Sequence, residues 1–359
     1  MEGDARWMAR CLELARQGWG LTSPNPMVGS VVVREGKMVG EGFHPKAGEP
    51  HAEVFALRDA GELAAGGTLY VNLEPCNHHG RTPPCTEAII AAGIQRVVVG
   101  MIDPNPRVAG SGIQRLRSAS ISVTTGVLQE ECEVLNEAFA HFITTGKPFG
   151  ILKYAMTLDG KIATWTGDSF WVSGEAARRL VHHWRAGYDA VIVGGNTVRK
   201  DDPQLTVRLV EGRNPLRVVL SRSLDLPLNA QIWDQSVAKT LVFSSHTANL
   251  AVRKHLEKCG VEVCALENLT PGAVSRALAE RQCLSTFWES GGTLSWAAVH
   301  EKAIQKLLTF IAPSLVGGAS APTPLAGEGI AQMEKALQLA KVSIQSVDKD
   351  WLFCGYLKY

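Results

Sequence analysis

Segments with the hydrophobic pattern of a strand alternate with segments of helical period along most of this chain. Near the N-terminus, residues 5–17 place apolar side chains on one helical face. A β-branched strand is predicted at 28–33, and a second strand at 38–42 after a turn. Further patterns predict helices at 51–60, 86–92 and 130–144 and strands at 68–73, 96–100 and 121–124. This order predicts a three-layer α/β/α domain.

The alternation continues after the segment TTGKP at 144–148, which has the turn chemistry of a linker. Strand patterns lie at 149–156, 190–193, 216–220, 240–243, 286–289 and 306–311, and helical periods at 174–186, 247–258, 271–281 and 293–302. A chain of 359 residues is long enough for two hydrophobic cores. We therefore predict two α/β domains, 1–146 and 147–359.

The composition and charge of the chain indicate which kind of binding partner to expect. Hydrophobic residues make up 45% of the chain and charged residues 20%, as in an ordinary soluble globular protein. Because 36 Lys and Arg nearly balance 35 Asp and Glu, and no basic run is present, we expect a small-molecule substrate and no nucleic-acid partner. The N-terminal sequence lacks the pattern of a signal peptide, and no apolar stretch is of membrane-spanning length. We therefore expect a cytoplasmic protein without a membrane partner, and a homo-oligomer is left open.

The eight cysteines are scattered through the chain, which favours reduced thiols over a disulfide framework. Two of them form a pattern with His51 and Glu53: Cys76 follows a predicted strand and Cys85 begins a predicted helix. One imidazole and two thiolates would leave the fourth position of a tetrahedral Zn²⁺ open for water, as a catalytic site requires. We predict His51, Cys76 and Cys85 as zinc ligands and Glu53 as the catalytic residue that carries protons.

The order His-x-Glu, Pro-Cys and Cys resembles that of the zinc nucleoside and nucleobase deaminases. In this chain eight residues, NHHGRTPP, separate the two cysteines, where those deaminases usually have two. Several alternatives stay open at this point. His78 or His79 could replace a thiolate, or could complete a purely structural zinc site in an interaction module. A deaminase that acts on a base in tRNA or single-stranded DNA is a third reading.

Three longer segments, 24–29 (PNPMVG), 48–53 and 76–85, resemble the pyrimidine deaminases of riboflavin biosynthesis, which are often fused to a reductase. The resemblance implies a cytidine-deaminase-like fold for the N-terminal domain. It also implies that four residues on loops around the pocket contact the substrate, although each alone could have a surface or turn role: Asn25, His44, His78 and Arg81.

The C-terminal half is similar, at 153–163, 170–174, 194–208 and 288–294, to the reductase of the same pathway, which has a dihydrofolate-reductase-like fold and uses NADPH. The resemblance implies that the deaminated pyrimidine is reduced from a ribosyl to a ribityl compound. The implied substrate contacts are Lys153, Ser169, Arg185, Leu205, Arg208 and Glu289. The implied NADPH contacts are Ala155, Trp171, Thr197, Asp201, Ser221, Gly291, Gly292, Thr293, Leu294, Ser295, Trp296 and Ala297.

Several of these residues also have an ordinary structural interpretation. The segment 201–203 could be a turn and helix N-cap, Trp171 a core residue and Arg208 a solvated charge. Lys153 could extend along an apolar surface, bind polar groups of the substrate or assist proton delivery. Gly291 has the best local support, because backbone amides at the start of a helix can approach a phosphate closely.

Overall fold

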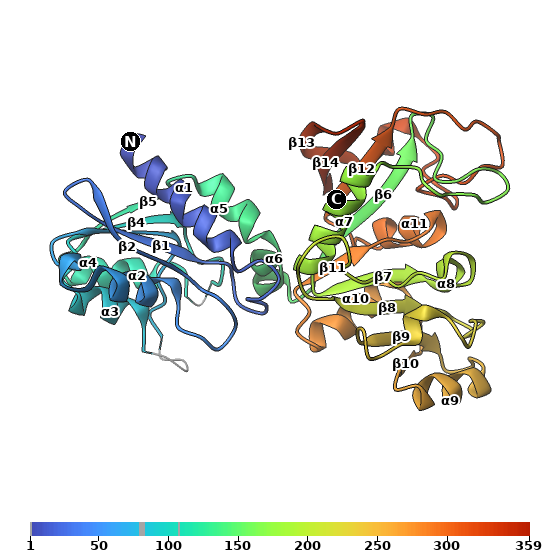
Figure 1. The fold of residues 1–359 in the computed structure, drawn as a ribbon, viewed down its shortest axis with the longest axis horizontal. Coiled ribbons are helices and arrows are strands. Elements are labelled where there is room, and N and C mark those ends of the chain that lie inside the picture. Colours follow the sequence, from blue (N-terminus) through green and yellow to red (C-terminus); the bar gives the residue numbers. More distant parts are fainter. Residues whose placement is uncertain (1, 79–82, 107) are drawn as a thin grey trace. The chain divides into compact units, whose positions relative to one another are not determined.

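The computed structural model describes residues 2–78, 83–106 and 108–359. The chain folds into two compact units, Met1–Gly146 and Lys147–Tyr359, and each unit has a sheet of its own (Figure 1). Among the described helices, none is both long enough and apolar enough to cross a membrane.

The N-terminal unit is built on a five-stranded sheet in the order β2-β1-β3-β4-β5. Its strands are β1 (Gly29–Arg34), β2 (Lys37–Phe43), β3 (Thr68–Leu73), β4 (Arg96–Met101) and β5 (Ser122–Thr125). The strand β1 is antiparallel to both its neighbours, whereas β3, β4 and β5 run parallel. The three central strands are almost completely buried, as expected for a sheet that is covered on both faces.

Helices cover both faces of this sheet. On one face lie α1 (Glu2–Arg16) and α5 (Gln129–Leu135), and on the other lie α2 (Ala52–Ala60), α3 (Cys85–Ala91) and α4 (Ser111–Ser118) (Figure 1). A short 3₁₀ helix (Gly61–Ala64) follows α2, and α6 (Glu137–Thr145) ends the unit. This arrangement confirms the three-layer α/β/α prediction.

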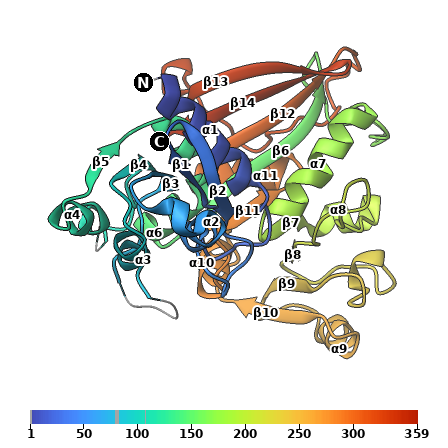
Figure 2. The same ribbon diagram turned by 60° about the vertical axis from the view of Figure 1, so that its left-hand side comes forward.

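The C-terminal unit has a nine-stranded sheet in the order β10-β9-β8-β7-β11-β6-β12-β14-β13. All neighbouring strands from β10 to β12 are parallel, and the last two are antiparallel, so that β13 and β10 form the two edges (Figure 2). The strands are β6 (Phe149–Thr157), β7 (Ala190–Gly194), β8 (Leu216–Leu220), β9 (Thr240–Ser245), β10 (Glu262–Leu266), β11 (Ser285–Trp288), β12 (Lys306–Ala312), β13 (Gln338–Val347) and β14 (Asp350–Lys358).

Five α-helices connect these strands: α7 (Glu175–Gly187), α8 (Gly195–Asp201), α9 (Leu250–Lys258), α10 (Pro271–Glu280) and α11 (Gly292–His300). Two short 3₁₀ segments lie at Gln231–Trp233 and Met333–Lys335. Aromatic contacts hold α7 on the sheet, since Trp184 packs on Phe287 of β11 and Phe310 of β12. The packing fixes the position of α7, which also carries side chains that line the cavity described below.

The structure corrects one predicted helix. The segment 130–144 is two helices, α5 and α6, because Asn136 interrupts the helical backbone. Its side-chain Oδ1 accepts from the amide of Met27 and its Nδ2 donates to the carbonyl of the same residue. The side chain thus joins α5 and α6 to the loop before β1, and no helical periodicity reports such a tertiary contact.

Among the described α-helices and strands, five had no predicted range: α4, α8, β10, β13 and β14. The strand β13 shows why: seven of its ten residues are exposed and the other three are partly exposed, so this edge strand has no pattern of alternating burial. Cys264 lies in β10 and Cys354 in β14, each within a short apolar run of the sequence.

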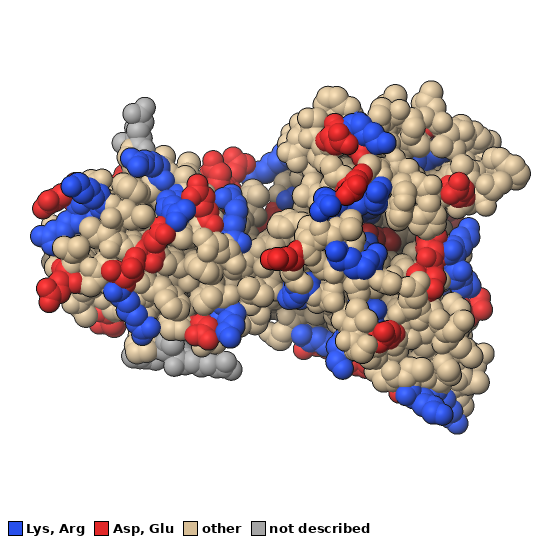
Figure 3. Space-filling view, viewed as in Figure 1, with Lys and Arg blue, Asp and Glu red and all other residues tan. Residues whose placement is uncertain are grey.

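Charged side chains of both signs are interspersed over the face of the molecule shown in Figure 3. This distribution agrees with the near balance of charges in the sequence. On that face, the figure shows no extended area of a single sign.

Candidate active sites

The three predicted metal ligands come from three elements that meet at one end of the N-terminal sheet. His51 is the residue immediately before α2, Cys85 is the first residue of α3, and Cys76 lies three residues beyond the end of β3. The backbone holds the last two together, because the amide of Thr86 donates to the carbonyl of Cys76 at 3.2 Å. Helix beginnings place unpaired backbone N–H groups near these sulfurs, which favours thiolates.

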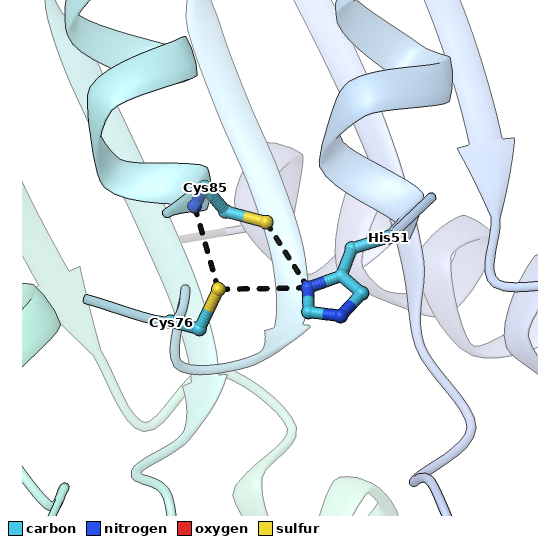
Figure 4. Close-up of side chains that lie close together, drawn as sticks. All are labelled: His51, Cys76 and Cys85. Atoms are coloured by element: carbon cyan, nitrogen blue, oxygen red, sulfur yellow. Dashed lines mark hydrogen bonds between the residues drawn. The ribbon is translucent and has the colours of Figure 1, made fainter. Parts of the chain in front are cut away.

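His51 Nδ1 faces both sulfurs, at 3.2 Å from Cys85 Sγ and 3.5 Å from Cys76 Sγ (Figure 4). The amide of Cys85 also donates to Cys76 Sγ at 3.4 Å. The contacts with Cys85 and His51 lower the pKa of the Cys76 thiol to about 4, against an opposing effect of burial. The three ligand atoms all lie within 4.8 Å of one another, and one nitrogen with two sulfurs is a donor set that suits zinc.

Glu53 lies beside this cluster in the first turn of α2. Its side chain is 3% exposed, and Oε2 is buried without a hydrogen-bond partner among the described residues. Burial is the main cause that raises the pKa of Glu53 to about 7. A buried carboxyl group with an unpartnered oxygen and a pKa near neutrality has the properties of a group that accepts and returns protons.

Asn25 and His44 form a pair next to the cluster. The ring of His44 lies 5.6 Å from that of His51, and the Pro50 carbonyl accepts from His44 Nδ1 at 3.0 Å. With the proton on Nδ1, Nε2 is free to accept from the amide nitrogen of Asn25, also at 3.0 Å. Burial lowers the pKa of His44, so the ring is neutral. The Oδ1 atom of Asn25 is then left to accept a hydrogen bond from a ligand.

The loop that carries Asn25 is held from behind by two asparagines. Asn136 makes the two bonds to Met27 described above, and Asn72 in β3 donates to the Met27 carbonyl and accepts from the Gly29 amide. Gly29 has no room for a side chain, because a Cβ there would lie 2.1 Å from the Cys11 carbonyl oxygen. The segment 24–29 is therefore a fixed scaffold for Asn25.

The remaining predicted residues of the deaminase site are not placed at the metal-ligand cluster by the structure. His78 is exposed and is not part of the cluster formed by His51, Cys76 and Cys85. His79 and Arg81 lie outside the described residues. The described residues therefore give no support to His78 as a metal ligand, and the role of Arg81 stays a prediction.

Sequence reasoning missed Glu74, which is 4% exposed. Its carboxylate accepts from four backbone amides in the segment after β4: those of Asp103, Gly110, Gly112 and Ile113, at 2.9–3.3 Å. Gly112 packs so closely that a Cβ would meet the Pro75 carbonyl oxygen at 2.1 Å. Glu74 therefore fixes Asp103 and the residues 110–113 next to the segment that carries Cys76.

In the C-terminal unit, a cavity of about 1440 Å³ opens beside the ends of the parallel strands. Its volume exceeds the usual range for one small ligand and is suited to a dinucleotide together with a substrate. All six predicted substrate contacts line it, as do ten of the twelve predicted cofactor contacts. Ligand cavities in open α/β sheets typically lie at this place.

Two predicted cofactor contacts, Ser295 and Trp296, do not line the cavity. Ser295 is completely buried and donates to the Ser290 carbonyl, and Trp296 packs towards His300. The helical period of α11 explains the difference, because Thr293, Leu294 and Ala297 share the face towards the cavity and the two residues between them turn away.

An ion-pair cluster lies at the substrate side of the cavity. Glu289, directly after β11, accepts from Arg185 of α7 through both oxygens, at 2.5 and 2.9 Å. Lys153 Nζ of β6 lies 3.9 Å from Glu289 Oε2. Burial opposes ionisation of Glu289, but the Arg185 charge and hydrogen bonds outweigh it and lower the pKa. Burial lowers the pKa of Lys153, while Glu289 acts in the opposite direction.

Arg208 differs from Arg185 in that it pairs with no carboxylate among the described residues. Its Nη1 donates to Gln204 Oε1 and Thr206 Oγ1, at 3.0 and 2.8 Å, and the side chain is exposed at the cavity. Arg217, buried in β8, donates to the Gln204 carbonyl. The segment 204–208 is thus fixed from behind while the charge of Arg208 stays available.

The structure overturns two structural readings of the cofactor residues. Trp171 is 67% exposed and has the Arg178 guanidinium 4.6 Å from its ring centre, so it is not a core residue. Asp201 is the last residue of α8, and Asp202 takes a left-handed conformation, so this segment ends a helix and is not an N-cap. Gly291 has no atom within 4 Å of a Cβ position, which leaves the backbone before α11 open.

Two family descriptions match the chain, and together they cover most of it. Residues 1–101 match the zinc-binding region of cytidine and deoxycytidylate deaminases. Residues 148–353 match the RibD C-terminal domain, which alone spans more than half of the chain.

A riboflavin biosynthesis protein RibD from Synechocystis is 57% identical over 357 residues, which cover 99% of this chain and 97% of that relative. The chain belongs to the RibD family. The structure of Acinetobacter baumannii RibD is similar with a TM-score of 0.88 at 40% identity, covering 100% of this chain and 99% of that one. A Thermotoga maritima deaminase and reductase gives a TM-score of 0.87 at 38% identity and covers 99% of both chains.

Membership in the RibD family defines the activities. The chain is a bifunctional enzyme of riboflavin biosynthesis that joins a zinc-dependent deaminase to an NADPH-dependent reductase. Its first unit is cytidine-deaminase-like and its second is dihydrofolate-reductase-like. This result favours the enzyme over the interaction module and the nucleic-acid deaminase that the zinc pattern alone left open.

Proposed function

We propose that the N-terminal unit, residues 1–146, deaminates 2,5-diamino-6-ribosylamino-4(3H)-pyrimidinone 5′-phosphate to 5-amino-6-(5-phosphoribosylamino)uracil. The C-terminal unit, residues 147–359, then reduces the ribosyl group of that product to a ribityl chain. The observation that carries the proposal is the convergence of His51, Cys76 and Cys85 beside the buried, unpartnered oxygen of Glu53. Small phosphorylated pyrimidines are the substrates at both sites.

In the deaminase site, His51 Nδ1 and the two thiolates would hold zinc, which supplies a Lewis acid that lowers the pKa of a water molecule. Glu53 Oε2 takes a proton from the attacking water and delivers it to the amino group that leaves as ammonia. Asn25 Oδ1 accepts from the pyrimidine edge, and the neutral His44 keeps the Asn25 amide in place. We assign His78 and Arg81 to the substrate's outer groups.

The zinc assignment predicts the metal content of purified protein. We expect about one zinc per chain, and Cys76→Ala is expected to lose it because two protein ligands rarely hold zinc. Elemental analysis measures the metal directly. The matched control is Cys259→Ala, since Cys259 is exposed and remote in sequence from the cluster. Full zinc content in Cys76→Ala would refute the ligand set.

At the substrate side of the reductase cavity, the carboxylate of Glu289 pairs with Lys153 and Arg185, and Arg208 adds a third cation that is not paired with it. This surplus of positive charge is suited to a phosphomonoester. NADPH supplies the hydride, and the open backbone at Gly291 together with α11 is placed to receive its phosphates. Lys153 Nζ, next to Glu289, is the group that we propose holds the proton used in the reduction.

We expect Arg208→Lys to raise the KM for the deaminated intermediate about tenfold or more, because a lysine does not reproduce bidentate recognition of a phosphate. Steady-state NADPH oxidation with the intermediate as the varied substrate measures this effect. The KM for NADPH should stay unchanged. With the dephosphorylated intermediate, wild type and variant should behave alike. A uniform loss on both substrates would argue against a phosphate contact.

We also propose that the enzyme works in the cytoplasm as a protein of small-molecule partners without nucleic acid or membrane. None of the eight cysteines, all of them described, forms a disulfide, which supports a reducing compartment. The oligomeric state, with a homo-oligomer among the options, can be measured by light scattering.

A further inference from the structure

His182 is a buried histidine at the substrate side of the reductase cavity to which sequence reasoning gave no role. It lies in α7 one turn before Arg185, so both side chains project from the same face of the helix. His182 is 6% exposed and lines the same cavity as Arg185 and Arg208. Histidine at such a place is either a brace for the cavity wall or a contact for the ligand.

The hydrogen bonds of His182 determine where its proton sits. The backbone amide of Arg208 donates to His182 Nδ1 at 2.9 Å, and an amide N–H can only donate. A neutral ring therefore carries its proton on Nε2. Nε2 has no hydrogen-bond partner among the described residues, and it is not among the unpartnered atoms that are completely buried, so it keeps some exposure to solvent. The ring thus has an unused donor at the cavity.

The surroundings keep this ring neutral. The charged groups that face it come from every element packed around it: Arg185 of α7, Arg208 of the segment 204–208, Lys153 of β6 and Glu289 after β11. Burial first, and then the two arginines, lower the pKa of His182 to about 4, while Glu289 offsets only part of this effect. At neutral pH, His182 therefore offers a hydrogen-bond donor without adding a fourth cation.

We propose that His182 Nε2–H donates to an oxygen of the substrate's phosphate, beside the Arg208 guanidinium. The proposal rests on the phosphorylated substrate assigned above to this cavity. Arg185 is already engaged with Glu289, whereas Arg208 pairs with no described carboxylate and is the cation to which an anion would go. His182 and Arg208 line the same cavity, and Nδ1 of His182 is occupied by the Arg208 backbone amide. Nε2–H is therefore the donor of this ring that is available to an anion bound by the Arg208 charge.

Two substitutions separate a ligand contact from a brace. Asparagine places a polar atom at the position of Nδ1, so His182→Asn keeps an acceptor for the Arg208 amide and removes the Nε2 donor. Glutamine places a polar atom at the position of Nε2, so His182→Gln keeps the donor and loses the acceptor. The contact predicts that His182→Asn raises the KM for the phosphorylated intermediate about tenfold or more with kcat nearly unchanged, since hydrogen bonds to charged groups are strong. His182→Gln should retain most of the affinity.

The KM for NADPH, measured in the same assays, reports whether the cavity is still intact. With the dephosphorylated intermediate, His182→Asn should match wild type, because the acceptor is missing. The reverse order of effects, with His182→Gln impaired and His182→Asn normal, would show a brace only and overturn the proposal. An equal loss for His182→Asn on both substrates would also overturn it, by pointing to a contact elsewhere on the substrate.

Arg208→Ala separates failure of this inference from failure of the proposed site. If Arg208→Ala raises the KM for the phosphorylated intermediate and His182→Asn does not, the site stands and the His182 contact is wrong. If neither changes it, the phosphate binds elsewhere and both fail. Nitrogen-15 spectra of histidine-labelled protein test the tautomer, and a His182 ring protonated on both nitrogens at pH 7 would contradict the proposal.

Discussion

Glu53→Gln is expected to abolish ammonia release while the reduction of supplied deaminated intermediate continues at the wild-type rate. Glutamine fills nearly the same volume but cannot take up a proton, and the loss of a general acid–base group costs about 10²- to 10⁴-fold in rate. Ammonia formation and NADPH oxidation, followed separately on one preparation, measure the two activities. The separation follows from the structure, because Glu53 belongs to a unit that has its own sheet and core.

The same variant is expected to keep its zinc and its stability. Glu53 Oε2 makes no hydrogen bond with the described residues, so the amide breaks no protein contact at that atom. Glu62→Gln, at an exposed position in the 3₁₀ helix Gly61–Ala64, is the matched control and should retain both activities. Loss of the reductase activity in a folded Glu53→Gln protein would argue against two independent sites.

Glu289→Gln is expected to destabilise the C-terminal unit by about 3 kcal/mol or more at pH 7, because it leaves Arg185 as a buried charge without its partner. Both side chains are nearly buried, at 12% and 11% exposure, so solvent screens the pair only weakly. Urea unfolding followed by tryptophan fluorescence measures the change. Glu280→Gln, an exposed residue of α10, is the control and should change little.

The pH dependence of this difference gives a second measurement. Because the folded state lowers the pKa of Glu289, its carboxylate contributes stability above the unfolded-state value of about 4.3, and that contribution is lost as the pH falls through the lowered folded value. The difference between wild type and Glu289→Gln should therefore be largest at neutral pH and shrink below pH about 4. The double variant Arg185→Met with Glu289→Gln should recover part of the loss, and a difference that grows on acidification would contradict the assignment.

Much of the fold could be predicted because its central strands are buried on both faces. Such strands, for example β4 and β7, contain continuous runs of apolar residues. The amphipathic helices around them keep a period that the sequence shows directly. The elements that escaped prediction, such as the exposed edge strand β13, lack this signal. Asn136 shows the other limit, since its partner Met27 is more than a hundred residues away in the chain.

The sequence alone determined the chemistry of this protein. Short motifs contain His51, Glu53, Cys76 and Cys85, whose side-chain types suit zinc binding and proton transfer. The reductase motifs contain most of the residues that were predicted to bind substrate and cofactor and that line the C-terminal cavity. Only the tertiary structure decided which neighbours tune these groups. The clamp of Glu74 on four amides, the pairing of Arg185 with Glu289 and the tautomer of His182 each depend on atoms from distant segments meeting in a buried place. Burial and hydrogen-bond geometry determine the protonation and orientation of these side chains, and neither can be inferred from the residues adjacent in sequence.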